Sequence, residues 1–258
     1  MSEQRVTIVT GASQGIGRAI AVAFGGEQDV VVLAARNLEG LNETATLVEK
    51  AGGMPMVVET DVTSETSVEQ MTRTVNDRHG RIDVLVNNSG IGGPSRRLWE
   101  VEPAEWRATF EVNVHGVFLV TRAVMPVMIA RGTGSVIIIG SVSGKRPLFG
   151  RSPYTSSKTA LIGMTRTLAH EAGAEGVRVN LISPGFVAGP RIDWVIEAQA
   201  GARGITAEEV RREFEAEAAL GRLTEPTDVA RAAVFLASEA ASGITGTDLN
   251  VNSGAVMY

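Results

Sequence analysis

The sequence predicts an α/β fold in which seven parallel strands form one sheet and helices cover both of its faces. Short runs rich in valine and isoleucine alternate with helix-length segments along the whole chain. This rhythm favours right-handed crossovers and a doubly wound sheet. With 258 residues and 44% hydrophobic residues, the chain can bury one sizeable core. We therefore expect a single domain over residues 1–258, without repeats or linkers.

The expected strands are short, apolar and rich in β-branched residues, as buried parallel strands are. They lie at Val6 to Thr10, Val30 to Ala34, Met56 to Glu59, Val84 to Asn87, Ser135 to Ile139, Arg178 to Ile182 and Asp248 to Val251. Helices are expected at 15–26, 38–51, 64–79, 103–130, 152–174 and 226–238. Residues 206–218 suit a pair of turns or a short helix, and 186–206 suit a loop that shapes a substrate site.

Charge and composition argue against several classes of partner and site. A net charge of -5 disfavours nucleic acid or an anionic membrane surface as the main partner. A chain without cysteine has no disulfide and no thiolate nucleophile. The three histidines lack metal-ligand spacing, so no metal is expected.

The lack of cysteine and two further features of the sequence predict a cytoplasmic protein. The most apolar long segment, 112–130, contains a histidine, an arginine and Asn113, which suits a helix buried by the sheet or by a partner subunit better than a membrane span. The first residues pass directly into a strand pattern, which leaves no signal peptide. No membrane association is expected.

The first strand leads into a glycine-rich turn, residues 10–17, that opens the first helix. Its sequence is Thr-Gly-Ala-Ser-Gln-Gly-Ile-Gly. Glycines let the backbone approach a pyrophosphate, and a helix N-terminus offers N–H groups and a positive dipole end. The spacing is one residue longer than the usual Rossmann fingerprint, and a tight turn without a ligand is the alternative. The candidate nucleotide contacts are Gly11, Ser13, Gln14, Gly15, Ile16 and Gly17.

The ends of the next three strands supply further candidate contacts to a nucleotide. The second strand is followed by an arginine, which suits the 2′-phosphate of NADP, whereas NAD calls for a carboxylate there. We therefore favour NADP(H), with NAD(H) as the alternative. A carboxylate after the third strand can accept the adenine amino group, although solvated cations and ordinary turn residues would explain the same positions. The candidates are Arg36, Asn37, Asp61, Val62, Asn88, Ser89 and Gly90.

An acid–base pair is predicted at Tyr154 and Lys158. Residues four apart share one face of a helix, so the ammonium lies beside a phenol whose unperturbed pKa is about 10. Two unit charges about 6 Å apart at an effective dielectric near 20 interact by roughly 3 kcal/mol, which lowers a tyrosine pKa by about two units. Ser141 follows an apolar strand at the edge where α/β sheets carry their chemistry. The alternative is a core tyrosine and a solvated lysine.

These motifs, in this order, resemble those of the short-chain dehydrogenase/reductase family, in particular its 3-oxoacyl-carrier-protein-reductase-like members. The resemblance runs from the glycine turn through Asn113 and the Ser-Tyr-Lys set to Pro184-Gly185 and a last strand at 246–254. It implies a Rossmann fold in which residues 1–140 mainly bind the cofactor and 141–258 carry catalysis and the substrate loops.

The resemblance also implies roles for individual residues. Tyr154 would be the general acid/base, and Ser141 would orient and polarise the substrate carbonyl. Lys158 would bind the nicotinamide ribose and lower the phenol pKa, and Asn113 would anchor a proton-relay water. Cofactor contacts would further include Tyr154, Lys158, Pro184, Gly185 and Val187. Helices such as 103–130 and 152–174 pair across a two-fold axis in this family, which implies a homotetramer or a dimer.

Three positions depart from the family's usual pattern. Ser89 stands where alanine is usual, which a turn should tolerate. Gly189 replaces a common threonine, so one contact to the carboxamide or phosphates would be missing. Asn252-Ser253 replaces Asp-Gly near the end and would alter packing between subunits.

The sequence therefore predicts an NAD(P)-dependent oxidoreductase that acts on a carbonyl or a secondary alcohol. Two alternatives stay open: a non-catalytic NADP-binding regulatory protein, and an NAD-dependent dehydrogenase of a polyol or hydroxy acid. A serine hydrolase is disfavoured because Val142, not serine, occupies the middle of the segment Gly140 to Gly144.

Cations are frequent in the segments expected at the mouth of the site. These are the loop 91–97, which ends in two arginines, the segment 186–206 with Arg191, and the positions Lys145, Arg146 and Arg151. Because the protein is acidic overall, these cations suggest a substrate with a carboxylate, phosphate or sulfonate, or a carrier-bound thioester. The alternative is that they are solvated loop residues. The substrate candidates are Ser141, Ser143, Arg151, Arg191 and Trp194.

Overall fold

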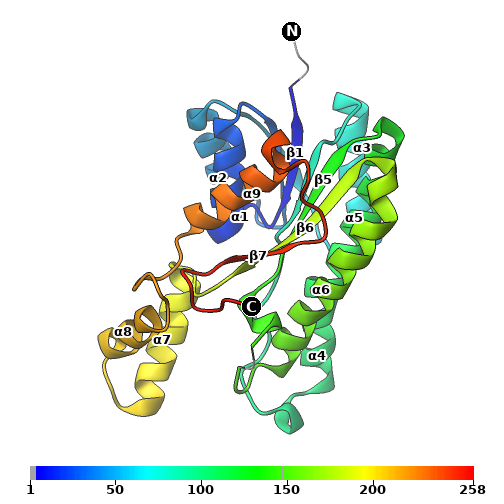
Figure 1. Cartoon of the computed structure of the whole chain (residues 1–258). Helices are drawn as coiled ribbons and strands as arrows, with labels where there is room; N and C mark the ends of the chain where they lie inside the picture. Colours follow the sequence, from blue (N-terminus) through cyan, green and yellow to red (C-terminus); the bar gives the residue numbers. More distant parts are fainter. Residues whose placement is uncertain (1–3, 147) are drawn as a thin grey trace.

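The computed structural model describes residues 4–146 and 148–258 and confirms the predicted fold. Seven parallel strands form one sheet in the order β3-β2-β1-β4-β5-β6-β7 (Figure 1). The strands are β1 (Val6–Thr10), β2 (Val30–Ala35), β3 (Met54–Glu59), β4 (Val84–Asn87), β5 (Gly134–Ile139), β6 (Val177–Pro184) and β7 (Asp248–Val251). The order reverses between β1 and β4, and a doubly wound sheet binds its ligand at such a reversal.

Two hydrophobic layers hold helices against the two faces of the sheet (Figure 1). One face is covered by α1 (Gly15–Gly26), α2 (Leu38–Ala51) and α9 (Pro226–Ala237). The other is covered by α3 (Glu65–His79), α5 (Gly116–Arg131) and α6 (Ser152–Ala172). Phe24 of α1 and Met128 of α5 have no exposed surface, and burying a side chain of this size contributes about 1.5–3 kcal/mol. Helices α1 and α2 begin and end where the sequence predicts.

The helix predicted at 103–130 consists of α4 (Pro103–Phe110), a π-helical turn η2 (Glu111–His115) and α5. The continuous helix, Pro103–Arg131, is long and apolar enough to cross a membrane, with a mean hydropathy of 1.6 over its most apolar window. Half of that window is buried inside the protein, where Val120 and Val124 pack in the core on the sheet. The helix therefore packs as a core element, as its polar interruptions suggest.

The segment predicted as a loop at 186–206 contains a helix, α7 (Pro190–Arg203). Proline in its first turn pre-sets a helical φ, and Gly204 ends it in the left-handed region with a φ of 67°. Its apolar side chains are spaced by four and pack on α8 (Ala207–Ala216) in a small third core. This stripe is narrow, and the small and polar residues between its members hide the helical pattern in the sequence.

The functional end of the sheet is the one at which the parallel strands finish. In Figure 1, α4, α7 and α8 lie beyond this end, which gathers the turns after β1, β4, β5 and β6. The remaining short helical turns are η1 (Leu98–Glu100), η3 (Val142–Gly144), η4 (Gly173–Glu175) and η5 (Glu239–Ala241). Residues 1–3, on which the expected absence of a signal peptide depends, lie outside the described residues.

Candidate active site

The glycine turn between β1 and α1 is closely packed and open on one side. Gly11 and Gly15 adopt φ values of 65° and 56°, which non-glycine residues rarely adopt. A Cβ on Gly17 would lie 2.2 Å from the carbonyl oxygen of Gly11, so only glycine fits there. Gln14 begins α1 without a side-chain capping bond, which leaves the first N–H groups of the helix to a ligand. This cradle suits a phosphate group.

Asn88 and Thr10 fasten the turn after β4 to the glycine turn. The Asn88 amide donates to the backbone oxygens of Thr10 (2.9 Å) and Gly11 (3.3 Å). The Thr10 hydroxyl oxygen accepts from the N–H groups of Asn88 (2.9 Å) and Ser89 (3.1 Å). The Asn88 side chain, predicted to contact a cofactor, thus has a structural task at this turn.

The end of β2 carries a cation and no carboxylate. Arg36 is exposed there and forms an ion pair with Asp61, whose Oδ2 lies 4.0 Å from Arg36 Nη1. Asp61 accepts hydrogen bonds from the Thr63 N–H (2.9 Å) and hydroxyl (2.8 Å), which hold the pKa of its carboxyl below the ordinary value. Asn37 caps α2 by accepting from the Gly40 N–H at 3.1 Å. Val62 is buried beside them, as expected of a side chain that packs against the adenine ring of a cofactor.

Asn113 lies at the centre of the π-helical turn η2 and is fully buried. Its Oδ1 accepts from the Ile91 N–H at 2.8 Å, and its Nδ2 donates to the Ile91 carbonyl at 2.9 Å and to Ser157 Oγ at 3.0 Å. Ser157 in turn donates to the Tyr154 carbonyl at 2.7 Å. Asn113 therefore joins the loop after β4 to the helix that carries the predicted acid. Sequence reasoning missed Ser157, although it lies between Tyr154 and Lys158.

Ser141, Tyr154 and Lys158 come together at the end of β5. Lys158 is 5% exposed, and its ammonium donates to the Ile139 carbonyl at 2.8 Å. The same ammonium lies 5.9 Å from the centre of the Tyr154 ring. Ser141 begins η3, where its hydroxyl donates to Ser143 Oγ at 3.1 Å and accepts from the Ser143 N–H at 3.1 Å.

Cations make the phenol of Tyr154 more acidic than usual. Burial raises its pKa. This increase is smaller than the combined decrease caused by the charges of Lys158 and Arg191, a hydrogen bond with Ser141 and the charge of Arg151. The net result is a tyrosine pKa below the ordinary value. Burial also lowers the pKa of Lys158, against the opposing effect of Tyr154. A phenol of lowered pKa beside a hydroxyl can give and take a proton at one oxygen atom.

Of the cations expected near the mouth, the structure places Arg151 and Arg191 at Tyr154 and pairs Lys145 and Arg146 elsewhere. The guanidinium carbons of Arg151 and Arg191 lie 5.2 and 5.5 Å from the centre of its ring. Lys145 instead binds Asp248 (3.0 Å) and Asn250 (2.6 Å). Arg146 pairs with Glu217 at 3.0 Å and lies over Phe186. Trp194, on α7, is 62% exposed.

The segment after β6 is shaped by glycines. A Cβ on Gly185 would lie 2.7 Å from the Cβ of Asn252, so the chain can pass only without a side chain. Pro184 ends β6, and Val187 forms a bridge to Thr224. Gly189 adopts a φ of 136°, a backbone conformation that threonine rarely adopts.

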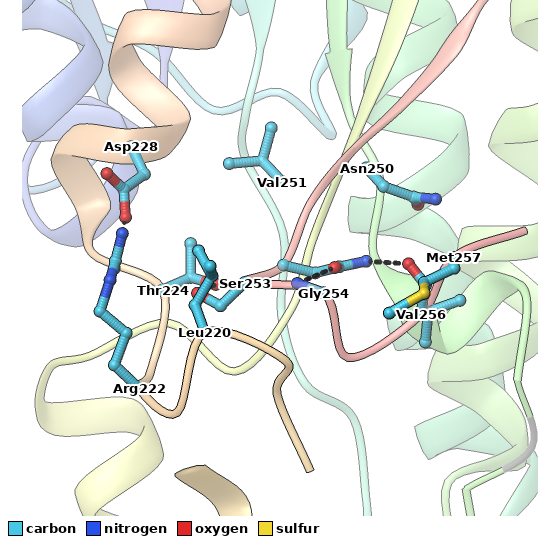
Figure 2. Close-up of a pocket in the computed structure, with 11 residues that line it drawn as sticks. Leu220, Arg222, Thr224, Asp228, Asn250, Val251, Ser253, Gly254, Val256 and Met257 are labelled. Carbon is cyan, nitrogen blue, oxygen red and sulfur yellow. Dashed lines mark hydrogen bonds and ion pairs between the residues drawn. The ribbon is translucent and has the colours of Figure 1, made fainter. Parts of the chain in front are cut away.

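The tail after β7 borders a pocket of about 490 Å³ (Figure 2). Ser253 lines it with a φ of 54°, the conformation that the family's usual glycine would adopt readily, and its hydroxyl bonds that of Thr224 at 3.1 Å. Arg222 and Asp228 close one side with an ion pair of 2.8 Å, seen in Figure 2. None of the candidate catalytic residues lines this pocket.

Sequence comparisons cover nearly the whole chain. A family model described as enoyl-(acyl carrier protein) reductase matches residues 11–256. The chain is 34% identical to the 3-oxoacyl-(acyl-carrier-protein) reductase FabG of Thermotoga maritima, over 99% of this chain and 99% of the relative. It is 35% identical to the cis-4-hydroxycyclohexanecarboxylate dehydrogenase of Sinomonas cyclohexanicum, over 97% of this chain and 96% of the relative.

Solved structures agree with the fold over its full length. A variant of the actinorhodin polyketide ketoreductase with NADPH matches with a TM-score of 0.95 and 34% identity, covering 100% of this chain and 99% of that one. A 7α-hydroxysteroid dehydrogenase complexed with NADH and 7-oxo glycochenodeoxycholic acid matches with a TM-score of 0.89 and 31% identity, covering 98% and 95%.

Proposed function

The chain belongs to the short-chain dehydrogenase/reductase family, and from this we propose how its own residues carry out the reaction. It is an NAD(P)-dependent oxidoreductase that moves hydride between a nicotinamide and a carbonyl or secondary alcohol. NADP(H) is the favoured cofactor and NAD(H) the alternative. In this proposal the chain is one domain, whose first 140 residues mainly bind the cofactor.

The residues of the site fit such a cofactor. The cradle that a Cβ on Gly17 would fill, together with the uncapped start of α1, would hold the pyrophosphate. Arg36 would offer a guanidinium fork to a 2′-phosphate, and Asp61 would accept a hydrogen bond from the adenine amino group. When bound, the nicotinamide supplies or accepts the hydride. The full set that we propose for the cofactor is Gly11, Ser13, Gln14, Gly15, Ile16, Gly17, Arg36, Asn37, Asp61, Val62, Asn88, Ser89, Gly90, Tyr154, Lys158, Pro184, Gly185 and Val187.

Tyr154 is the proposed general acid/base. In reduction its hydroxyl gives a proton to the carbonyl oxygen as hydride reaches the carbon, and in oxidation the phenolate takes the alcohol proton. Ser141 donates a second hydrogen bond to the same oxygen, where charge develops. Lys158 keeps the phenol acidic, and Asn113 positions the loop at Ile91. The observation that carries this proposal is the buried Lys158 ammonium, 5.9 Å from the ring of a tyrosine whose pKa is lowered.

Two of the similar proteins suggest different substrate classes. One is a reductase of 3-oxoacyl groups on a carrier protein, and the other is a dehydrogenase of a hydroxycyclohexanecarboxylate. The first fits a carrier-bound thioester and the second an anionic substrate. Both react at a carbonyl or secondary alcohol, so the Tyr154 chemistry serves either. The contacts that we propose for the substrate are Ser141, Ser143, Arg151, Arg191 and Trp194.

We also propose that the protein is a cytoplasmic homo-oligomer. A groove of about 570 Å³ runs between α5 and α6, lined by exposed or half-buried apolar side chains such as Phe118, Ile129 and Met164. A second copy of the same helices would cover this groove. A dimer built on it, or a tetramer of two such dimers, follows from two-fold symmetry.

Replacing Tyr154 by phenylalanine tests the catalytic assignment. The variant lacks only the hydroxyl, so we expect NADPH binding to persist while turnover falls by about 100-fold or more. NADPH oxidation would be measured with a panel of 3-oxoacyl thioesters, cyclic ketones, sugars and polyols, with NADH in parallel. The chain's other tyrosine, Tyr258, is 76% exposed, and Tyr258→Phe is the matched control. Undiminished turnover in the Tyr154 variant would refute the assignment.

A further inference from the structure

Two arginines from different segments flank the phenol of Tyr154. Arg151 immediately precedes α6, and Arg191 lies in the first turn of α7. Figure 1 shows these helices on opposite sides of the end at which the strands finish. Both guanidinium groups nevertheless reach the same ring, with their carbons 5.2 and 5.5 Å from its centre.

The two guanidinium groups converge over Gly92, in the loop after β4. Arg151 Nη2 donates to the Gly92 carbonyl at 2.8 Å. A Cβ on Gly92 would lie 2.8 Å from Arg191 Nη2 and 3.1 Å from Arg151 Nη2, so both groups lie close to one point. The two Nη2 atoms are therefore near enough to each other for one small ligand group to contact both arginines.

Neither arginine has an acidic partner among the described residues. Other cations of the same molecule do: Arg146 pairs with Glu217 and Lys145 with Asp248. Arg151 is half-buried, and two cations brought together without a counter-charge repel each other. Arg191 is exposed, so a ligand can reach the pair from solvent, and both arginines adjoin the residue that we propose as the general acid/base.

We propose that this oxidoreductase acts on an oxo acid or hydroxy acid whose carboxylate is held between Arg151 and Arg191. A planar guanidinium binds a carboxylate through two parallel hydrogen bonds, and the two oxygens of one carboxylate can serve two such groups. The carbonyl of the same molecule reaches Tyr154 and Ser141. This inference rests on the proposed function and narrows it, because a carrier-bound thioester has no free carboxylate at this place.

The two arginines could instead serve only to lower the pKa of the phenol. That role would affect every substrate equally, because it changes the acid rather than the contact to the substrate. A carboxylate contact affects only substrates that carry the charge. Comparison of an acid with its uncharged ester therefore separates the two roles.

The experiment measures kcat and KM for NADPH oxidation with 3-, 4- and 5-oxo acids and with their methyl esters. We expect the wild-type enzyme to prefer at least one acid over its ester by about tenfold or more in kcat/KM. Arg151→Gln and Arg191→Gln should each lower kcat/KM for that acid by about tenfold more than for its ester, with the additional loss mainly in KM, because the ester is affected only through the pKa of Tyr154. The kcat/KM of Arg191→Lys for the acid should lie between the values of the wild type and of Arg191→Gln. Arg78→Gln, an exposed arginine at the end of α3, is the control.

Equal kcat/KM for acids and esters in the wild type, or equal losses for both in the arginine variants, would overturn the proposal. A second readout does not need turnover: binding of hexanoate and of hexanamide to the NADPH-loaded protein, measured by calorimetry. We expect hexanoate to bind and the Arg151 and Arg191 variants to lose it, while hexanamide binds weakly throughout. Absence of hexanoate binding would overturn the carboxylate site. Hexanoate binding without turnover of any carbonyl would contradict the proposed function alone.

Discussion

Lys158 donates to a carbonyl oxygen, not to a carboxylate, and this choice of partner leaves its charge free to act on Tyr154. The Ile139 carbonyl at 2.8 Å satisfies one proton of the ammonium without neutralising it. A carboxylate there would cancel the field at the phenol. The position of one backbone oxygen at the end of β5 thus contributes to the acidity of the site.

The pH dependence of alcohol oxidation should report this effect. The phenolate is the base in that direction, so the rate rises as pH passes upward through the pKa of Tyr154. Lys158→Met removes the largest influence that lowers this pKa and leaves burial, which raises it. We expect the rise of kcat against pH to move to higher pH and the rate at neutral pH to fall by about tenfold or more. Lys50→Met, at an exposed lysine of α2, should leave the profile unchanged, and an unshifted profile in the Lys158 variant would contradict the argument.

Gly17 gives a second prediction at the scale of one residue. A methyl group there would lie 2.2 Å from the Gly11 oxygen, so Gly17→Ala must displace the glycine turn. We expect a loss of about 1–3 kcal/mol in the free energy of unfolding and a large loss of NADPH affinity. At Gly26, in the same helix, a methyl group would meet no atom within 4 Å, so Gly26→Ala should leave both quantities nearly unchanged. Urea denaturation and NADPH fluorescence titration would measure them, and equal behaviour of the two variants would refute the steric reason.

At the scale of an element, the π-helical turn η2 explains how Asn113 can be both buried and useful. The extra residue of such a turn lets the amide face the loop after β4, where it makes both backbone hydrogen bonds of Ile91. The irregular turn in the long helix therefore holds a loop whose neighbouring residue, Gly92, lies beneath Arg151 and Arg191.

Asn113→Ala should release that loop. It leaves the Ile91 N–H and carbonyl without their partner, and we expect about 2 kcal/mol or more of lost stability. Hydrogen exchange should become faster at Ile91 and along 92–97. Ser157→Ala, which keeps both Ile91 bonds, should have a smaller effect on exchange there. Unchanged protection of the Ile91 amide in the Asn113 variant would show that the loop is held in another way.

The sequence predicted the strands, most helices and the candidate site because each of them depends on a local pattern. Strand runs, the glycine turn and the Tyr154–Lys158 spacing are local patterns, and local patterns can be read without coordinates. The sequence did not predict helix α7 because its apolar stripe is narrow. The stripe identifies a helix only when its packing against α8 is known. The partners of Lys145 and Arg146 could not be predicted either, since Asp248 and Glu217 are distant in the sequence.

At the scale of the whole molecule, the groove between α5 and α6 gives a test of assembly. Phe118 is 44% exposed in the single chain, so Phe118→Glu should fold but should place a charge in the proposed interface. We expect a smaller particle by size-exclusion chromatography with light scattering. Leu47→Glu, at a 38% exposed leucine of α2, should keep the wild-type mass. A wild-type mass for both variants would place the interface elsewhere or show that the protein is a monomer.

The ion pair between Lys145 and Asp248 has a practical consequence. Lys145 follows Ser141 by four residues and also binds Asn250, whose amide reaches the Tyr258 carbonyl at 3.5 Å. A fusion, truncation or affinity tag at the carboxyl terminus would therefore change the surroundings of Asn250, which binds Lys145 close to the serine turn. The start of β1 lies at the opposite end of the strands (Figure 1), so a tag for purification or immobilisation belongs at the amino terminus.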